Sequence, residues 1–155
     1  MKYEIVDINY SRLFINSSIT DNVDFYNEKH LEKFLKEIIL SLKEKYKVVL
    51  KGLYEVVLSI NNDVGAVVDL EKIETFLSSS KDIDLHIKVI FDCKFYFKTN
   101  DFYSVETLEE IYYYKGNYYV DASLIKDIFK YIEFGQILQK NEEDIEEIGM
   151  KVGKM

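Results

Sequence analysis

The sequence predicts an α+β fold in which a mostly antiparallel sheet is covered on one face by two amphipathic helices. Three observations carry this prediction. Short β-branched and aromatic segments alternate apolar with polar residues, as half-buried strands do. Two segments, residues 28–46 and 124–134, instead repeat their apolar residues with helical spacing. The 155 residues match a single domain spanning 1–155, in which the small polar run at 78–81 marks an internal boundary if there are two small αβ halves.

The first part of the chain predicts a hairpin and a long helix. Lys2–Asp7 and Ser11–Asn16 alternate as two strands, and Ser17–Asn22 is typical of a loop. Asn27 is placed to cap the following helix, and Tyr26 to pack against its first turn. Apolar residues of this helix recur at i, i+3, i+4, i+7, i+8 and i+11, namely Leu31, Phe34, Leu35, Ile38, Ile39 and Leu42.

The rest of the chain predicts more strands and two further helices. The expected strands are Val48–Leu50, Leu53–Ile60, Ala66–Leu70, Ile83–Phe91, Lys94–Lys98, Ile111–Tyr114 and Tyr118–Asp121. Asn61–Gly65 and Lys115–Asn117 supply residues that tolerate the positive φ of hairpin turns. Leu124–Phe134 is the second amphipathic helix, and Glu142–Met150 is a short acidic one.

Composition disfavours nucleic acid and membrane partners. The net charge is −8, from 28 acidic and 20 basic residues, so most of the surface would repel a phosphate backbone. Arg12 is the only arginine, which leaves few bidentate phosphate or guanine contacts. No apolar run has the length of a membrane span, and the first residues do not resemble a secretory signal. We therefore expect a cytoplasmic protein.

Candidate catalytic and metal-binding residues are few. His30, His86 and Cys93 are the obvious nitrogen and sulfur ligands, and they are widely spaced in the sequence. A single cysteine excludes an internal disulfide. The chain has no glycine-rich phosphate loop, no strained serine turn and no paired histidine motif of a metalloprotease. We expect no cofactor, no metal and no catalytic activity.

A cluster of tyrosines is the one feature of the sequence that points to a binding site. Exposed tyrosine is typical of interfaces, because it offers a large rigid ring with one polar tip. Successive strand residues point to opposite faces, so some of these rings must be partly exposed. The sequence therefore predicts a protein-binding hairpin made of Tyr112, Tyr113, Tyr114, Lys115, Asn117, Tyr118 and Tyr119. The alternative is that the rings cover the sheet and pair across its strands.

The order of elements resembles MecA-type adaptors of low-GC Gram-positive bacteria, which select substrates for a ClpC-type unfoldase. The matching segments are Lys2–Asn9 with Leu13–Ile15, Lys51–Leu58, Ile83–Phe97, Tyr112–Val120 and Ile132–Ile137. The family has a long acidic linker between two domains and a further helix before the element that matches Phe134-Gly135, and both are missing here. The resemblance implies a non-enzymatic regulator that binds other proteins.

Function is therefore expected to be protein binding, as an adaptor or regulator. One alternative is a small acidic effector of a phage or mobile element that inhibits a nucleic-acid-binding host protein by charge mimicry, using the run 142–147. Another is a domain that reads single-stranded RNA by stacking bases on the tyrosines, with Lys94, Lys98 and Lys115 near by. An enzyme ranks last. The partner's identity and the oligomeric state do not follow from the sequence.

Overall fold

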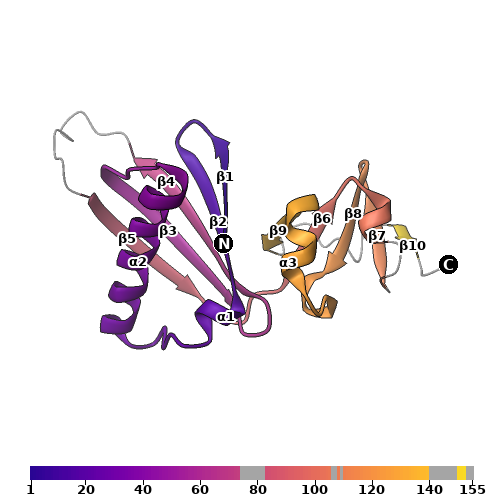
Figure 1. The fold of residues 1–155 in the computed structure, drawn as a ribbon, viewed down its shortest axis with the longest axis horizontal. Coiled ribbons are helices and arrows are strands. Elements are labelled where there is room, and N and C mark those ends of the chain that lie inside the picture. Colours follow the sequence, from indigo (N-terminus) through magenta and orange to yellow (C-terminus); the bar gives the residue numbers. More distant parts are fainter. Residues whose placement is uncertain (74–82, 106–107, 109, 140–149, 153–155) are drawn as a thin grey trace. The chain divides into compact units, whose positions relative to one another are not determined.

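The fold is that of a computed structural model, in which residues 1–73, 83–105, 108, 110–139 and 150–152 are described. The chain forms two compact units, and each contains its own sheet (Figure 1). Unit 1 comprises residues 1–60 and 65–90, and unit 2 comprises residues 61–64 and 91–155. The internal boundary expected at 78–81 lies outside the described residues.

Unit 1 contains a five-stranded sheet in the order β1-β2-β4-β3-β5. Its strands are β1 Lys2–Asp7, β2 Tyr10–Asn16, β3 Gly52–Asn61, β4 Gly65–Ile73 and β5 Ile83–Ile90. The β1–β2 and β2–β4 pairs are antiparallel, whereas β3 and β5 run parallel. One long helix, α2 (Glu28–Tyr46), lies across one face of this sheet (Figure 1).

Local sequence signals explain where α2 begins and ends. The side chain of Asn27 accepts hydrogen bonds from the backbone N–H groups of Lys29 and His30, at 3.0 and 3.3 Å. The helix ends where Lys47 adopts the left-handed conformation (φ 59°) and the N–H of Val48 bonds back to the carbonyl of Leu42. The face turned to the sheet buries Phe34, Leu35, Ile38 and Leu42, which confirms the predicted apolar stripe at its centre.

Three expectations for unit 1 are wrong. Ser17–Thr20 forms the one-turn helix α1 where a loop was expected. Residues 48–50 form no strand, because the chain uses them to turn from the end of α2 into β3. The ring of Tyr26 is 81% exposed, so it does not pack as a staple. Its neighbour Phe25 instead packs edge-on against Phe34 of α2, with ring centroids 5.2 Å apart.

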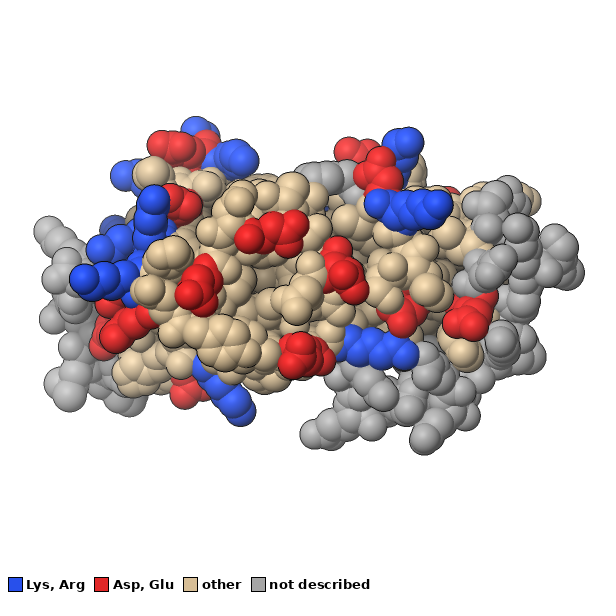
Figure 2. Space-filling model, turned by 90° about the horizontal axis from the view of Figure 1, so that it is seen from below, with Lys and Arg blue, Asp and Glu red and all other residues tan. Residues whose placement is uncertain are grey.

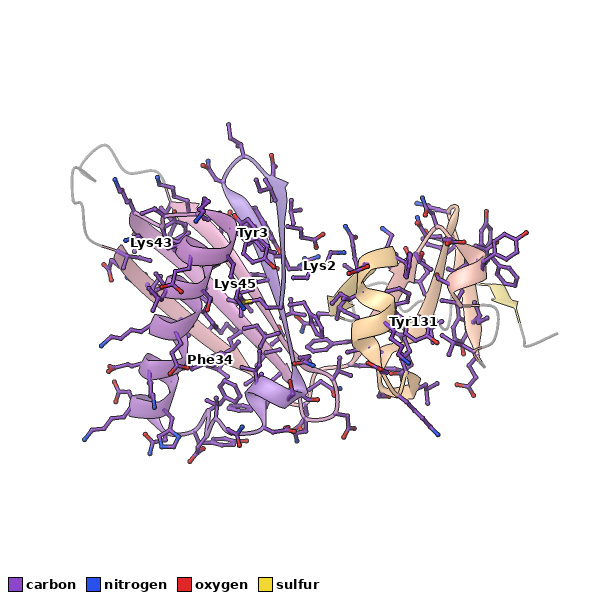
Figure 3. All side chains as sticks on the ribbon, viewed as in Figure 1. Lys2, Tyr3, Phe34, Lys43, Lys45 and Tyr131 are labelled. Atoms are coloured by element: carbon purple, nitrogen blue, oxygen red, sulfur yellow. The ribbon has the colours of Figure 1, made fainter. Side chains whose placement is uncertain are left out.

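Unit 2 contains a second sheet in the order β10-β7-β8-β6-β9, with antiparallel pairs throughout. The strands are β6 Phe95–Thr99, β7 Ile111–Tyr114, β8 Asn117–Asp121, β9 Gln136–Gln139 and β10 Met150–Val152. Short helices complete the unit: η1 Phe102–Ser104, η2 Ala122–Leu124, α3 Ile128–Tyr131 and η3 Ile132–Phe134. Phe95 and Phe97 of β6 are fully buried, and the ring of Tyr131 on α3 packs 6.0 Å from that of Phe97 (Figure 3).

The predicted continuous helix Leu124–Phe134 is wrong. The segment is divided into η2, α3 and η3, with Ile125 extended between the first two. The carboxylate of Asp121 accepts hydrogen bonds from the N–H and hydroxyl of Ser123, which favours a short turn over a helix. Of the predicted helix Glu142–Met150, residues 142–149 lie outside the described residues, and Met150 begins β10.

The structure confirms the α+β class and the mostly antiparallel pairing. The two helical segments do not share one sheet, because α2 packs in unit 1 and α3 packs in unit 2. Among the described residues, none of the helices has the length and apolar character needed to cross a membrane.

Candidate protein-binding site

The predicted tyrosine hairpin forms as β7 and β8. Its turn consists of Lys115 and Gly116, whose φ angles are 47° and 81°. Positive φ at both central residues is typical of the type I′ turn that joins tightly twisted strands. The hairpin prediction is therefore confirmed, with the left-handed positions at Lys115 and Gly116.

Strand register separates the tyrosines onto two faces. Tyr113 lies opposite Tyr118, with ring centroids 5.2 Å apart. These two rings share a face with Ile111 and Val120, both fully buried. Phe102 extends the row, since its ring lies 5.1 Å from that of Tyr118. Tyr113 thus lies on the face that carries the core of unit 2.

The opposite face carries Tyr112, Tyr114 and Tyr119 together with lysines. The ammonium of Lys115 lies 5.1 Å from the ring centroid of Tyr114, and that of Lys98 lies 6.0 Å from Tyr119. These separations are those of cation–π pairs. A third pair, Lys94 over Tyr96 at 5.3 Å, lies on the same face.

The hairpin rings are half-buried or buried, whereas its tip residue Lys115 is exposed. Tyr119 is only 8% exposed and Tyr96 only 2%, so neither presents an open ring for base stacking. The placement of Tyr113 favours the alternative in which the rings cover the sheet. A binding role for this hairpin, including Asn117 and Tyr112, stays a prediction.

The candidate metal ligands do not converge. His30 lies exposed on the first turn of α2, and His86 lies exposed on β5. Cys93 belongs to unit 2 and is 7% exposed, with its sulfur 3.5 Å from the amide nitrogen of Gln139. Among the described residues, no group of three or more His, Cys, Asp and Glu side chains could hold a metal ion.

Among the described residues, exposed apolar side chains gather instead at and beside the turn between β1 and β2. The members of this cluster are Ile5, Ile8 and Val49, which are 74%, 91% and 55% exposed, and the neighbouring Val6 is 51% exposed. All three members line one open hollow of about 150 Å³. We call this cluster the tip patch. Contiguous exposed apolar side chains mark interaction surfaces more often than isolated ones do.

Hydrogen bonds hold the tip patch in place. Oδ1 of Asp7 accepts from the N–H of Ile8 at 2.7 Å. The N–H of Lys72 on β4 donates to the carbonyl of Asn9 at 2.8 Å. The turn is therefore tied both to itself and to the neighbouring sheet, so Ile8 is presented by an ordered backbone.

Aromatic residues wall the hollow beside the tip patch. Tyr3 and Tyr54 line it, and Tyr3 packs against Tyr46 in the last turn of α2, with ring centroids 5.5 Å apart (Figure 3). Burial is the main cause that raises the pKa of Tyr54. The aromatic wall offers a flat apolar surface that suits an apolar side chain.

Sequence reasoning missed the tip patch, although a signal was present. Ile5 and Val6 are adjacent β-branched residues, so a strand cannot turn both to the same face. The structure resolves this with a shift of register between Ile5 and Asp7. Such bulges redirect side chains at sheet edges, and here both Ile5 and Val6 remain exposed.

The surface that Figure 2 shows carries no continuous basic patch. On the part of each unit that Figure 2 shows, acidic side chains are scattered among larger uncharged areas, and Lys and Arg side chains form no continuous line.

Comparison of the chain with protein-family models, with curated proteins and with solved structures finds no match.

Proposed function

We propose that the protein is a non-enzymatic, protein-binding regulator of the cytoplasm and that the tip patch is its binding surface. The observation that carries this proposal is the exposure of Ile5 near the end of β1 and of Ile8 in the turn that follows, a turn that hydrogen bonds keep ordered. Because the backbone of the turn is already ordered, a partner that covers these side chains has little further backbone to order. The hollow next to them provides a pocket for an apolar side chain of the partner.

The partner expected from this chemistry is a protein segment with apolar side chains. The rim of the hollow carries one charge of each sign, Asp7 and Lys72, so no strongly charged ligand is favoured. A MecA-type adaptor role agrees with this proposal and stays a prediction. The acidic run 142–147, on which charge mimicry depends, lies outside the described residues.

A photo-crosslinking experiment tests the proposal. A photoreactive phenylalanine analogue replaces Ile8, and in a control chain it replaces Leu40, which is 53% exposed on α2 of the same unit. Irradiation in the native cytoplasm should link the Ile8 chain to a discrete protein and leave the Leu40 chain unlinked. Irradiation of a cell extract in high salt should give the same adduct, because salt screens charges and does not weaken the apolar contacts that bring the two proteins together before the crosslink forms.

A second step assigns the adduct to the patch. With the isolated partner, Ile5→Lys should weaken affinity by about tenfold or more, which is the effect of losing an apolar anchor. Leu40→Lys, with the same change of side chain, should leave affinity unchanged. Equal adducts from both positions, an adduct that does not form when irradiation is done in high salt, or an adduct with another copy of this chain would each contradict the proposal.

A further inference from the structure

An apolar row on β5 is less covered than the row beside it. In the parallel pairing of β3 with β5, Val56 lies opposite Ile87. Val56 is 1% exposed, whereas Ile87 is 39% exposed. Ile83, Leu85 and Val89, on the same face as Ile87, are only half-buried. The helix α2 therefore covers the apolar face of β3 more fully than that of β5.

The outer edge of β5 has the features of a pairing edge. Among the described residues, β5 is an outer strand of its sheet and pairs only with β3. Its register is continuous over eight residues, from Ile83 to Ile90, with no bulge. Proline is absent from the whole chain. Edge strands are kept unpaired by short length, bulges, proline, a covering element or charged side chains. Of the features that β5 itself can show, it has only the charges on one face, Asp84 and Lys88, which are of opposite sign.

We propose that β5 pairs antiparallel with β5 of a second copy of this chain, about a two-fold axis at His86. This inference goes beyond the proposed function, because β5 and the tip patch are on different strands. The pairing would join the two sheets of unit 1 into one continuous sheet. A closed two-fold contact of this kind is the commonest route to a homodimer.

Charge complementarity selects this register. With the axis at His86, Asp84 lies opposite Lys88 of the second copy, and Lys88 lies opposite Asp84 of the second copy. Opposite charges directly across a strand pair are stabilising. An axis at Ile87 would instead place Asp84 opposite Ile90 and His86 opposite Lys88, and so lose both ion pairs.

Apolar residues also match in this register. Ile83 lies opposite Val89 and Leu85 lies opposite Ile87, so the half-covered row of one copy continues into that of the other. Every pair joins two odd-numbered or two even-numbered residues. Side chains that meet therefore share a face, and the outward backbone groups of one strand meet the outward groups of the other.

A charge-swap series tests the ion pairs by sedimentation over a range of protein concentrations. The wild-type chain should form a dimer that dissociates on dilution. Lys88→Asp places two carboxylates opposite each other and should weaken the dimer by about tenfold. The double variant Asp84→Lys with Lys88→Asp restores opposite charges and should recover most of the wild-type affinity. Lys36→Asp, the same charge change on α2, should have little effect.

A cysteine pair tests the axis independently. In His86→Cys the two new cysteines face each other with Cα atoms about 4.5–5.5 Å apart, which suits a disulfide. In Asp84→Cys the two cysteines are separated by four residues along the strands, about 13 Å. Mild oxidation should link the first variant and not the second. Wild type, whose Cys93 is buried, should not link. A monomeric wild type, a double variant as weak as Lys88→Asp, or equal linkage of both cysteine variants would overturn the proposal.

Discussion

Arg12 donates a hydrogen bond from Nε to Oδ1 of Asp69 at 2.9 Å, and the two residues are register partners on β2 and β4. The hydroxyl of Tyr10 donates to the same oxygen at 2.5 Å and accepts from a terminal nitrogen of Arg12 at 3.0 Å. The single arginine of the chain is thus part of a closed three-residue network. Burial, followed by the hydrogen bond and charge of Asp69, raises the pKa of Tyr10.

This network predicts a loss of stability at alkaline pH. Because the pKa of Tyr10 is higher in the folded state, its protonated hydroxyl stabilises the fold fully at any pH below the unfolded tyrosine pKa of about 10. This stabilisation is lost as the pH rises through the higher pKa that Tyr10 has in the folded state. The loss should be below about 1 kcal/mol, because the group is partly solvated. Urea unfolding from pH 8 to 11 should show a steeper decline for wild type than for Tyr10→Phe.

Tyr54 provides the internal control for this comparison. Its pKa is also raised, and it titrates in both proteins, so only the difference between the two curves reports on Tyr10. Parallel curves above pH 10 would show that the Tyr10 hydroxyl contributes nothing through Asp69.

The apolar stripe of α2 predicts a large effect from a single truncation. Leu35 is 5% exposed against the sheet, so Leu35→Ala should lower the free energy of unfolding by about 2–5 kcal/mol. Leu40→Ala, on the solvent side of the same helix at 53% exposure, should change it by less than about 0.5 kcal/mol. Urea denaturation of both variants measures the difference. Similar values for the two would place the core elsewhere.

Two glycines with positive φ should respond differently to alanine. A Cβ on Gly65 would lie 2.0 Å from the carbonyl oxygen of Ile15, whereas a Cβ on Gly116 would meet nothing within 4 Å. Gly116→Ala should therefore cost only the left-handed backbone strain, about 1–2 kcal/mol. Gly65→Ala adds a backbone clash between β2 and β4 and should cost clearly more. Thermal melts of the two variants measure the difference. Equal losses of stability would show that the close approach of Gly65 to the backbone of β2 adds no cost.

Local signals in the sequence were sufficient to predict some helices and strands and not others. The bounds of α2 followed from its apolar period and from the cap at Asn27, both of which act within a few residues. The parallel pairing of β3 with β5 could not be predicted in this way, because the partner of a strand is set by distant segments. The same limit explains why one sheet was expected where the chain builds two.

The candidate site shows a related limit. The β7–β8 hairpin was predicted because Gly116 next to polar residues is a turn signal of its own. Which face of the hairpin is buried depends on what packs against it, and alternation alone does not decide that. The tip patch was not predicted because residues 2–7 were assigned to one alternating strand, although Val6 falls on the face of the polar Lys2 and Glu4.

Tyr113 is the residue that decides between the two interpretations of the hairpin. Its ring contacts Tyr118 and shares a face with the buried Ile111, so Tyr113→Ala should lower stability by removing a cross-strand aromatic pair, by about 0.5–1.5 kcal/mol beyond the lost burial. Tyr112→Ala, on the opposite face of the same strand, is the matched variant.

If Tyr113 anchors an interface, its truncation should instead weaken binding of an identified partner by about 2 kcal/mol, or thirtyfold, at little cost to the fold. Unfolding and affinity measured on the same protein give both quantities. We expect the stability loss with unchanged affinity, and the reverse result would restore the hairpin as the binding surface in place of the tip patch.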